Sequence, residues 1–228
     1  MRQIQYTFVA IGLLFMFNCT SDSNTELIDS NSLNAYNNKV IPHDGFSHFQ
    51  EIPFKNSIIH LNEAGPNDAF TIQEITKQKQ DIKYRAQKIP SELYLRNKGI
   101  EGEELAQALK EIDGEQLFYF EFEETEKQDL IKKYLEDDLD ANISYLSFDI
   151  SNDFKLIKAN GDTINSTYSL HERNYHVAPF ERLIVSFNGI DQNETVQLIY
   201  NDQLFGKGKF DFAFASTNYI ENNIKNPS

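Results

Sequence analysis

The chain has 228 residues and a formal net charge of −14, with 35 Asp and Glu against 21 Lys and Arg. Such an acidic surface repels phosphate backbones, so nucleic acid is not an expected partner. Cys19 is the only cysteine, which excludes a disulfide within the chain, and the core has to form from apolar packing, for which 18 Phe and 11 Tyr are available.

An apolar run stands at the start of the chain. Residues 6–17 are apolar apart from Thr7 and Gly12, follow the positively charged Arg2, and end just before Cys19. This order is typical of the three regions of a secretory signal. The run is about a dozen residues long, against the roughly 20 that cross a bilayer, so a permanent transmembrane anchor fits poorly.

The segment Leu14-Phe15-Met16-Phe17-Asn18-Cys19 resembles the lipobox of bacterial lipoproteins. In that family signal peptidase II cleaves before the cysteine, and the new terminus receives acyl chains such as palmitate. Asn18 replaces the small residue of proteobacterial lipoboxes, but lipoboxes of Bacteroidota tolerate it. The polar residues 20–24 also resemble those of flavobacterial lipoproteins. The resemblance implies lipidation at Cys19 and a protein anchored to the outer membrane, on its periplasmic or its surface face.

The composition divides the chain into five expected segments. These are a signal peptide at 1–18, a lipidated cysteine and flexible tether at 19–39, a mixed α/β region at 40–141, a β-sandwich at 142–218 and a polar tail at 219–228. The tether is assigned because it is rich in Ser, Asn and Asp and has too few apolar residues to form a buried face. Whether the two folded regions are one domain or two is left open by the sequence.

The mixed region is expected to hold two helices among its strands. Apolar residues recur with helical spacing over 101–112, which predicts an amphipathic helix. Residues 117–123 place three Phe on one face opposite Glu121 and Glu123, which predicts a half-buried strand. A second helix, starting with a capping box, is expected over 125–139.

Short strands separated by turn residues follow residue 142. The expected strands are 143–150, 154–159, 164–168, 183–187, 195–200 and 207–214. The last places Phe210, Phe212 and Phe214 inward. This pattern resembles the small immunoglobulin-like domains of bacterial lipoproteins. The expected fold is therefore mainly β with two helices (α+β), with a C-terminal antiparallel immunoglobulin-like β-sandwich.

No local motif positions a nucleophile, a phosphate or a dinucleotide, so no catalytic residue is assigned. His171 and His176 are five residues apart, which points them away from each other on a helix and to opposite faces of a strand. Neither a metal nor another cofactor is therefore expected.

Two candidate contacts and one modification site can be named. Tyr168 precedes the expected irregular loop at 169–179 and Tyr175 lies within it, and such loops often carry binding residues. The triplet Asp162-Thr163-Ile164 resembles the acceptor for O-linked glycans in exported proteins of Bacteroidota, which implies a glycan at Thr163.

These observations favour a membrane-anchored, exported lipoprotein that acts as a non-catalytic module, binding or scaffolding a protein or glycan partner. Two alternatives remain open. One is a hydrolase that uses two carboxylates, because Asp and Glu are the reactive side chains in good supply. The other is an accessory subunit of a cell-envelope machine, for which a large apolar patch is expected.

Overall fold

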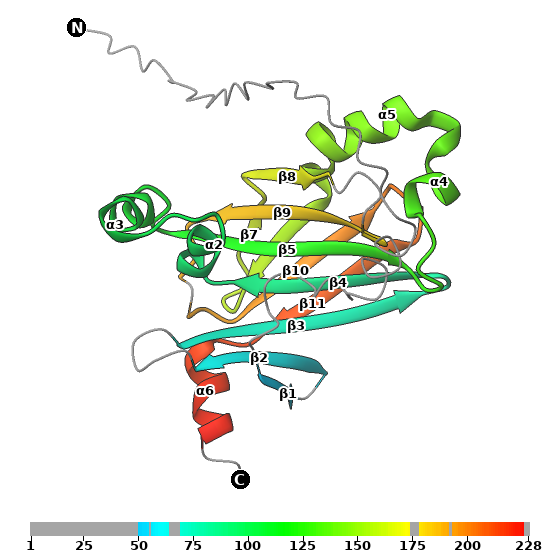
Figure 1. Cartoon of the computed structure of the whole chain (residues 1–228). Coiled ribbons are helices and arrows are strands. Elements are labelled where there is room, and N and C mark those ends of the chain that lie inside the picture. Colours follow the sequence, from blue (N-terminus) through cyan, green and yellow to red (C-terminus); the bar gives the residue numbers. More distant parts are fainter. Residues whose placement is uncertain (1–49, 55, 64–68, 174–177, 192, 226–228) are drawn as a thin grey trace, which may run out of the picture. The chain divides into compact units, whose positions relative to one another are not determined.

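Two antiparallel sheets face each other in the computed structural model (Figure 1). The structure describes residues 50–54, 56–63, 69–173, 178–191 and 193–225. These residues fall within one unit, which begins at His43. The regions at 40–141 and 142–218 both contribute to the larger sheet, so they share one core.

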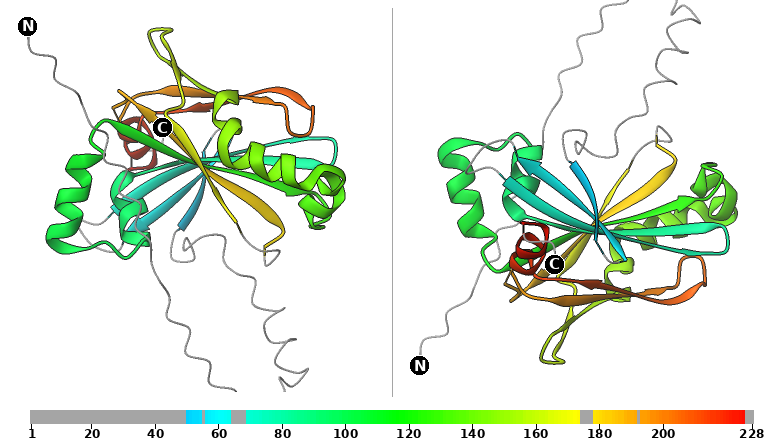
Figure 2. Two further views of the ribbon diagram at one scale, coloured as in Figure 1. Left: turned by 90° about the horizontal axis from the view of Figure 1, so that it is seen from above. Right: turned by 90° about the horizontal axis from the view of Figure 1, so that it is seen from below.

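The larger sheet has seven strands in the order β1-β2-β3-β4-β5-β9-β8. Their bounds are β1 Gln50–Phe54, β2 Ser57–Glu63, β3 Ala69–Lys79, β4 Ile82–Ile89, β5 Glu115–Glu124, β8 Tyr168–Glu172 and β9 Phe180–Asn188. The smaller sheet has four strands in the order β11-β10-β6-β7. Their bounds are β6 Phe154–Lys158, β7 Thr163–Asn165, β10 Val196–Asp202 and β11 Gly208–Phe214. Figure 2 shows β10 and β11, in orange, as a layer beside the twisted larger sheet.

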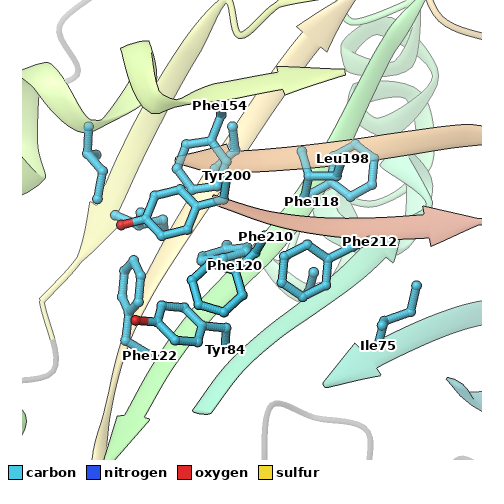
Figure 3. Packing of buried hydrophobic residues seen from close by; sticks show 14 of the residues in the cluster. Ile75, Tyr84, Phe118, Phe120, Phe122, Phe154, Leu198, Tyr200, Phe210 and Phe212 are labelled. Carbon is cyan, nitrogen blue, oxygen red and sulfur yellow. The ribbon is translucent and has the colours of Figure 1, made fainter. Parts of the chain in front are cut away.

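The core lies between the sheets and is largely aromatic (Figure 3). The rings of Tyr84 and Phe210, from opposite sheets, have centroids 4.1 Å apart. Phe120 on β5 meets Phe154 on β6 edge to face at 4.9 Å, a favourable ring geometry. Phe212 is fully buried among them. Burying aromatic rings of this size supplies much of the stability of the fold.

Five α-helices lie among the described residues, more than the two expected. Their bounds are α2 Ser91–Asn97, α3 Gly102–Glu111, α4 Leu130–Tyr134, α5 Leu139–Ser144 and α6 Thr217–Lys225. Three further helical turns are η2 Glu136–Asp138, η3 Tyr145–Asp149 and η4 Ile150–Asp153. Leu93 on α2 packs on the outer face of the larger sheet, which is the face that points away from the smaller sheet.

The main expectations for the fold are confirmed. The protein is mainly β with additional helices, and its antiparallel sheets form a sandwich. The expected helix at 101–112 is α3, and the expected inward row of Phe210, Phe212 and Phe214 is buried with exposures of 6%, 0% and 0%. The sandwich takes strands from both sides of residue 142, because β1 to β5 form most of the larger sheet.

Several local expectations are wrong. Residues 143–150 are helical, because Leu146 and Ile150 bury one face of a helix and leave Phe148 77% exposed. The capping box at 125 is not used: α4 starts later, and the Asp129 side chain accepts from the N–H of Lys132 at 3.0 Å.

The expected polar tail at 219–228 is also wrong, because it overlaps α6. Ile220 is 2% exposed, so this helix buries an apolar side chain. The N–H of Ile220 bonds to Ser216, which starts the helix directly after β11. One buried residue in a polar stretch was too weak a signal to predict a helix from the sequence.

Candidate binding groove

A groove of about 390 Å³ runs along one side of the sandwich, between β3 and β11. Its volume lies within the range of about 300 to 1,000 Å³ that small-ligand sites occupy. It forms because β11 is the last strand of the smaller sheet and contacts β3, whereas β2 and β1 continue the larger sheet beyond that point. The inner faces of β2 and β3 therefore extend past the edge of the layer that covers them.

The floor of the groove is apolar. Ile75 on β3 and Phe214 on β11 line it, with exposures of 7% and 0%. Ala213 adds a small side chain at the edge of β11. Figure 3 shows Ile75 at the margin of the aromatic core, beside Phe212. An apolar floor with polar groups at its ends is typical of a binding site.

Polar pairs lie at the two ends of the groove. At one end, Gln73 donates from Nε2 to the hydroxyl of Ser57 at 3.0 Å and accepts from the N–H of Ala215 at 2.9 Å. At the other end, the ammonium of Lys77 lies 3.0 Å from Oδ1 of Asp211. The hydrogen bond from Lys77 holds the pKa of Asp211 below its usual range, so this carboxylate stays ionised at neutral pH.

The open edge of β11 faces the groove with its main-chain groups. The N–H of Ala215 points away from β10, toward Gln73, and the carbonyl of Lys207 accepts from the ammonium of Lys79 on β3. Because strand residues alternate with a period of two, the N–H and C=O groups of the odd-numbered residues between them point the same way. Those of Asp211 and Ala213 therefore face the groove. The N–H of Asp211 bonds to its own carboxylate, and no other described residue pairs with these groups.

Charged side chains form a belt across the outer face of the larger sheet, away from the groove. Arg85 lies directly opposite Glu121, to which its Nη1 donates at 2.5 Å. Arg182 binds the other oxygen of Glu121 through Nε and Nη2, at 2.8 and 2.7 Å. Arg85 also lies 3.3 Å from Glu74 and 3.4 Å from Glu123. These buried carboxylates are held in ion pairs, which differs from the free acid that a glycosidase needs.

The electrostatics of Glu74 support the same conclusion. Burial by itself raises the pKa of this carboxyl, but the His60 ring 3.1 Å away, the charge of Arg85 and a 2.7 Å hydrogen bond from Gln87 outweigh burial and hold the pKa below its usual range. A general acid requires a raised pKa. Glu74 is therefore suited to accept hydrogen bonds and ion pairs from its neighbours, and it is not suited to act as a general acid.

A second group of carboxylates lies beside the core. Asp202 accepts hydrogen bonds from the hydroxyls of Tyr84 and Tyr200 at 2.7 and 3.1 Å and from two main-chain N–H groups of the loop that follows it. Asp153 accepts from Tyr145. Burial, together with the nearby Asp202, raises the pKa of Asp153. Asp202 is 3% exposed and uses both oxygens, so it anchors the β10–β11 loop.

The residues proposed from the sequence do not meet at one site. Tyr168 is 42% exposed on β8, so the expected irregular loop begins as a strand, and Tyr175 and Cys19 lie outside the described residues. Thr163 is exposed at the start of β7. His171 pairs with Glu181 at 2.7 Å.

The other proposed features concern metals and membranes. The described residues contain no group of three or more His, Cys, Asp or Glu side chains placed to hold a metal ion. His176 lies outside that part of the chain. None of the helices within it is both long and apolar enough to cross a bilayer.

No protein-family model, curated protein or solved structure matches this chain. The groove was missed by sequence reasoning because Gln73 and Ala215, which lie at one of its ends, are 142 positions apart. The alternating residues of β11 predicted the strand, but nothing in them predicted that it would lie at an edge.

Proposed function

We propose that the protein is an exported, lipid-anchored and non-catalytic binding module, held at the outer membrane through Cys19. The lipobox resemblance supports the anchor. The groove beside β11 supports binding, because it combines an apolar floor with main-chain groups that a ligand can satisfy. This groove is the observation that carries the proposal, and it replaces the loop after Tyr168 as the main candidate site.

The carboxylate hydrolase is the weaker alternative. Glu121 accepts from two arginines, and Asp202 accepts from two tyrosines and the main chain. Neither residue lines the groove. Among the described residues that do, the one carboxylate is that of Asp211, which is paired with Lys77. The accessory-subunit alternative is supported by exposed apolar side chains such as Phe148, which is 77% exposed, and it predicts binding on that face instead.

The proposal also keeps two sites outside the groove. Tyr168 and Tyr175 remain candidate contacts for a larger partner. Thr163 remains a candidate for an O-linked glycan, since an exposed side chain at the start of a strand is open to modification.

Hydrogen exchange on the full chain in phospholipid vesicles tests the binding site. Mixed pools of short peptides and of oligosaccharides serve as probes. We expect a bound probe to protect the amides of residues 211–215 and to leave the probe chemically unchanged. Ala213→Trp should abolish the protection, because the indole fills the groove. Lys155→Trp, at an exposed position of the same sheet, is the matched control and should retain it.

Two results would reject the proposal. Chemical turnover of a probe that depends on Glu121 or Asp202 would favour the hydrolase. Failure of every probe class to change exchange at 211–215 would remove the groove as the binding site.

A further inference from the structure

We propose that the groove binds an extended peptide as an added strand, antiparallel to β11, with a carboxylate near the C-terminal end of the peptide held by Lys79 and Lys209. This inference rests on the proposed binding function and names its ligand class. It follows from three features of the groove: unpaired main-chain groups, local charge and the space beside β11.

The main chain of β11 offers a strand edge of defined length. Gln73 and Lys79 on β3 bind the first and last edge-facing groups, at Ala215 and Lys207. Between them, the edge-facing N–H and C=O groups of residues 209–213 make no hydrogen bond to another described residue, although the N–H of Asp211 bonds to its own carboxylate. An extended peptide pairs with such groups by the same ladder that joins neighbouring strands. The side chains of Gln73 and Lys79 thus mark the two ends of the β11 edge that a peptide can pair with.

Local charge sets the direction of the peptide. One end of the groove is locally basic, although the whole chain carries a charge of −14. Four lysines lie near this end: Lys77, Lys79, Lys207 and Lys209. The neighbouring acids are Asp81 and Asp211. Asp211 pairs with Lys77, and Asp81 lies 3.6 Å from Lys207.

Lys79 and Lys209 therefore have no carboxylate partner within the described residues. These two lysines lie beside the first half of β11, which starts at Gly208. A peptide antiparallel to β11 brings its C-terminal end there, whereas a parallel peptide brings its positive amino terminus toward the lysines. Charge complementarity favours the antiparallel direction.

Space excludes a second copy of the chain that pairs antiparallel to β11, the direction that charge favours. Antiparallel pairing of β11 with the β11 of another copy places the two smaller sheets in one layer and the two larger sheets in the next. Because β2 and β1 of each copy extend beyond β11, by about 5 Å for each strand, they would occupy the same volume. A single extended segment has no second layer and fits without this clash.

The floor sets the side chains that the peptide can carry. Alternate residues of an added strand point inward, where they meet Ile75 and Phe214. Apolar side chains such as Val are suited to these positions, and polar ones such as Thr to the outward positions.

A set of synthetic pentapeptides tests the inference with the full chain in vesicles. The parent probe is acetyl-Val-Thr-Val-Thr-Val with a free C-terminus. One variant is the C-terminal amide of the parent, which has no carboxylate. Another is an amide that ends in Asp, which has only a side-chain carboxylate. The set therefore separates binding through the terminal carboxylate from binding through a side-chain carboxylate. We expect the parent, the Asp peptide or both to bind about tenfold more tightly than the plain amide.

Two further probes are N-methylated, each at one of two adjacent central residues. Only one of these N–H groups can face β11, so one probe should lose binding by about tenfold and the other should bind like the parent. Equal binding by both would overturn strand addition.

Ala213→Pro removes an edge-facing N–H that makes no hydrogen bond to β10. An edge strand tolerates proline at such a position. We expect this variant to keep its melting temperature and to lose the parent peptide. Lys209→Glu is a second variant, and it leaves the main-chain hydrogen bonds of β11 unchanged. It should lower the affinity for the best carboxylate peptide to the affinity for the plain amide. Lys155→Glu, at an exposed position of the same sheet, makes the same charge change and should have no effect.

The possible failures are distinguishable. If all peptides fail at millimolar concentration while an oligosaccharide protects residues 211–215, strand addition is wrong and the proposed binding function stands. If no probe class protects these residues, both fail. Retention of full affinity by Lys209→Glu would overturn the charge assignment.

Discussion

Arg85 and Glu121 face each other directly across the β4–β5 pair, with the Arg85 Nη1 atom 2.5 Å from the Glu121 Oε2 atom and the Glu121 side chain 1% exposed. The other oxygen of Glu121 binds Arg182. One carboxylate thus joins three neighbouring strands on the outer face of the larger sheet. Neutralising this carboxylate is costly, because two guanidinium groups lose the same charged acceptor at once.

Glu121→Gln should therefore destabilise the protein by about 1.5 to 3 kcal/mol, because two half-buried guanidinium groups lose the charged acceptor that they share. Both arginines keep a second carboxylate nearby, which limits the loss. Urea unfolding followed by circular dichroism measures this change. Glu103→Gln, on the exposed side of α3, is the control and should stay within about 0.5 kcal/mol of the unchanged protein. An increase in stability would instead indicate a carboxylate kept for catalysis at the expense of the fold.

The aromatic core gives a second prediction. Phe212 is fully buried, and its ring meets that of Phe120 at 5.5 Å. Phe212→Ala should cost about 3 to 5 kcal/mol, because it removes the transfer free energy of the ring and leaves a cavity. Phe148→Ala removes the same ring from a site that is 77% exposed and should leave the melting temperature nearly unchanged. An unchanged melting temperature for Phe212→Ala would show that the sheets do not pack as described.

Local patterns allowed several elements to be predicted from the sequence. The alternating Phe210, Phe212 and Phe214 indicated a strand with one buried face, and the spacing within 101–112 indicated a helix. These signals are local, because strand and helix periods appear within a few residues. Residues 143–150 gave a false strand, since their apolar positions fit both periods and only tertiary packing selects between them.

The candidate site could not be predicted because it depends on strand order. Edge and centre strands have similar local patterns, so nothing within 207–214 indicates that β11 ends a sheet. The same limit applies to Glu121 and Glu123. The sequence predicted them on the open face of a half-buried strand, yet they are 1% and 3% exposed, because β5 lies between β4 and β9, which supply the arginines. Partners so distant along the chain leave no local signal.

Lipidation at Cys19 is a further prediction. Mass spectrometry of the mature N-terminal peptide should find acyl chains on this residue, and the protein should fractionate with membranes. Cys19→Ala removes the acceptor thiol and should release the protein from the membrane fraction. Asn18→Gly places a small residue before the cysteine and should preserve lipidation. An unmodified Cys19 in the mature protein would contradict the anchor.

The last prediction concerns Lys88, whose ammonium donates to the carbonyl of Glu194 at 3.0 Å in a buried site. Burial lowers the pKa of Lys88 to about 8 from 10.5, against the opposing charges of Asp191 and Glu194. Between about pH 8 and 10 the unfolded chain then holds a proton that the folded protein has lost. The free energy of unfolding contributed by this residue should therefore rise with pH in that window.

The test compares Lys88→Met with the unchanged protein by urea unfolding at several pH values. The difference in stability should shift in favour of the unchanged protein by about 2 kcal/mol from pH 8 to pH 10, since a full proton difference is worth about 1.4 kcal/mol per pH unit. Below pH 8 both states are protonated, so the difference should be flat. Lys155→Met, at an exposed position, should show no such trend. Parallel pH profiles for Lys88→Met and the unchanged protein would mean that Lys88 is not desolvated in the fold.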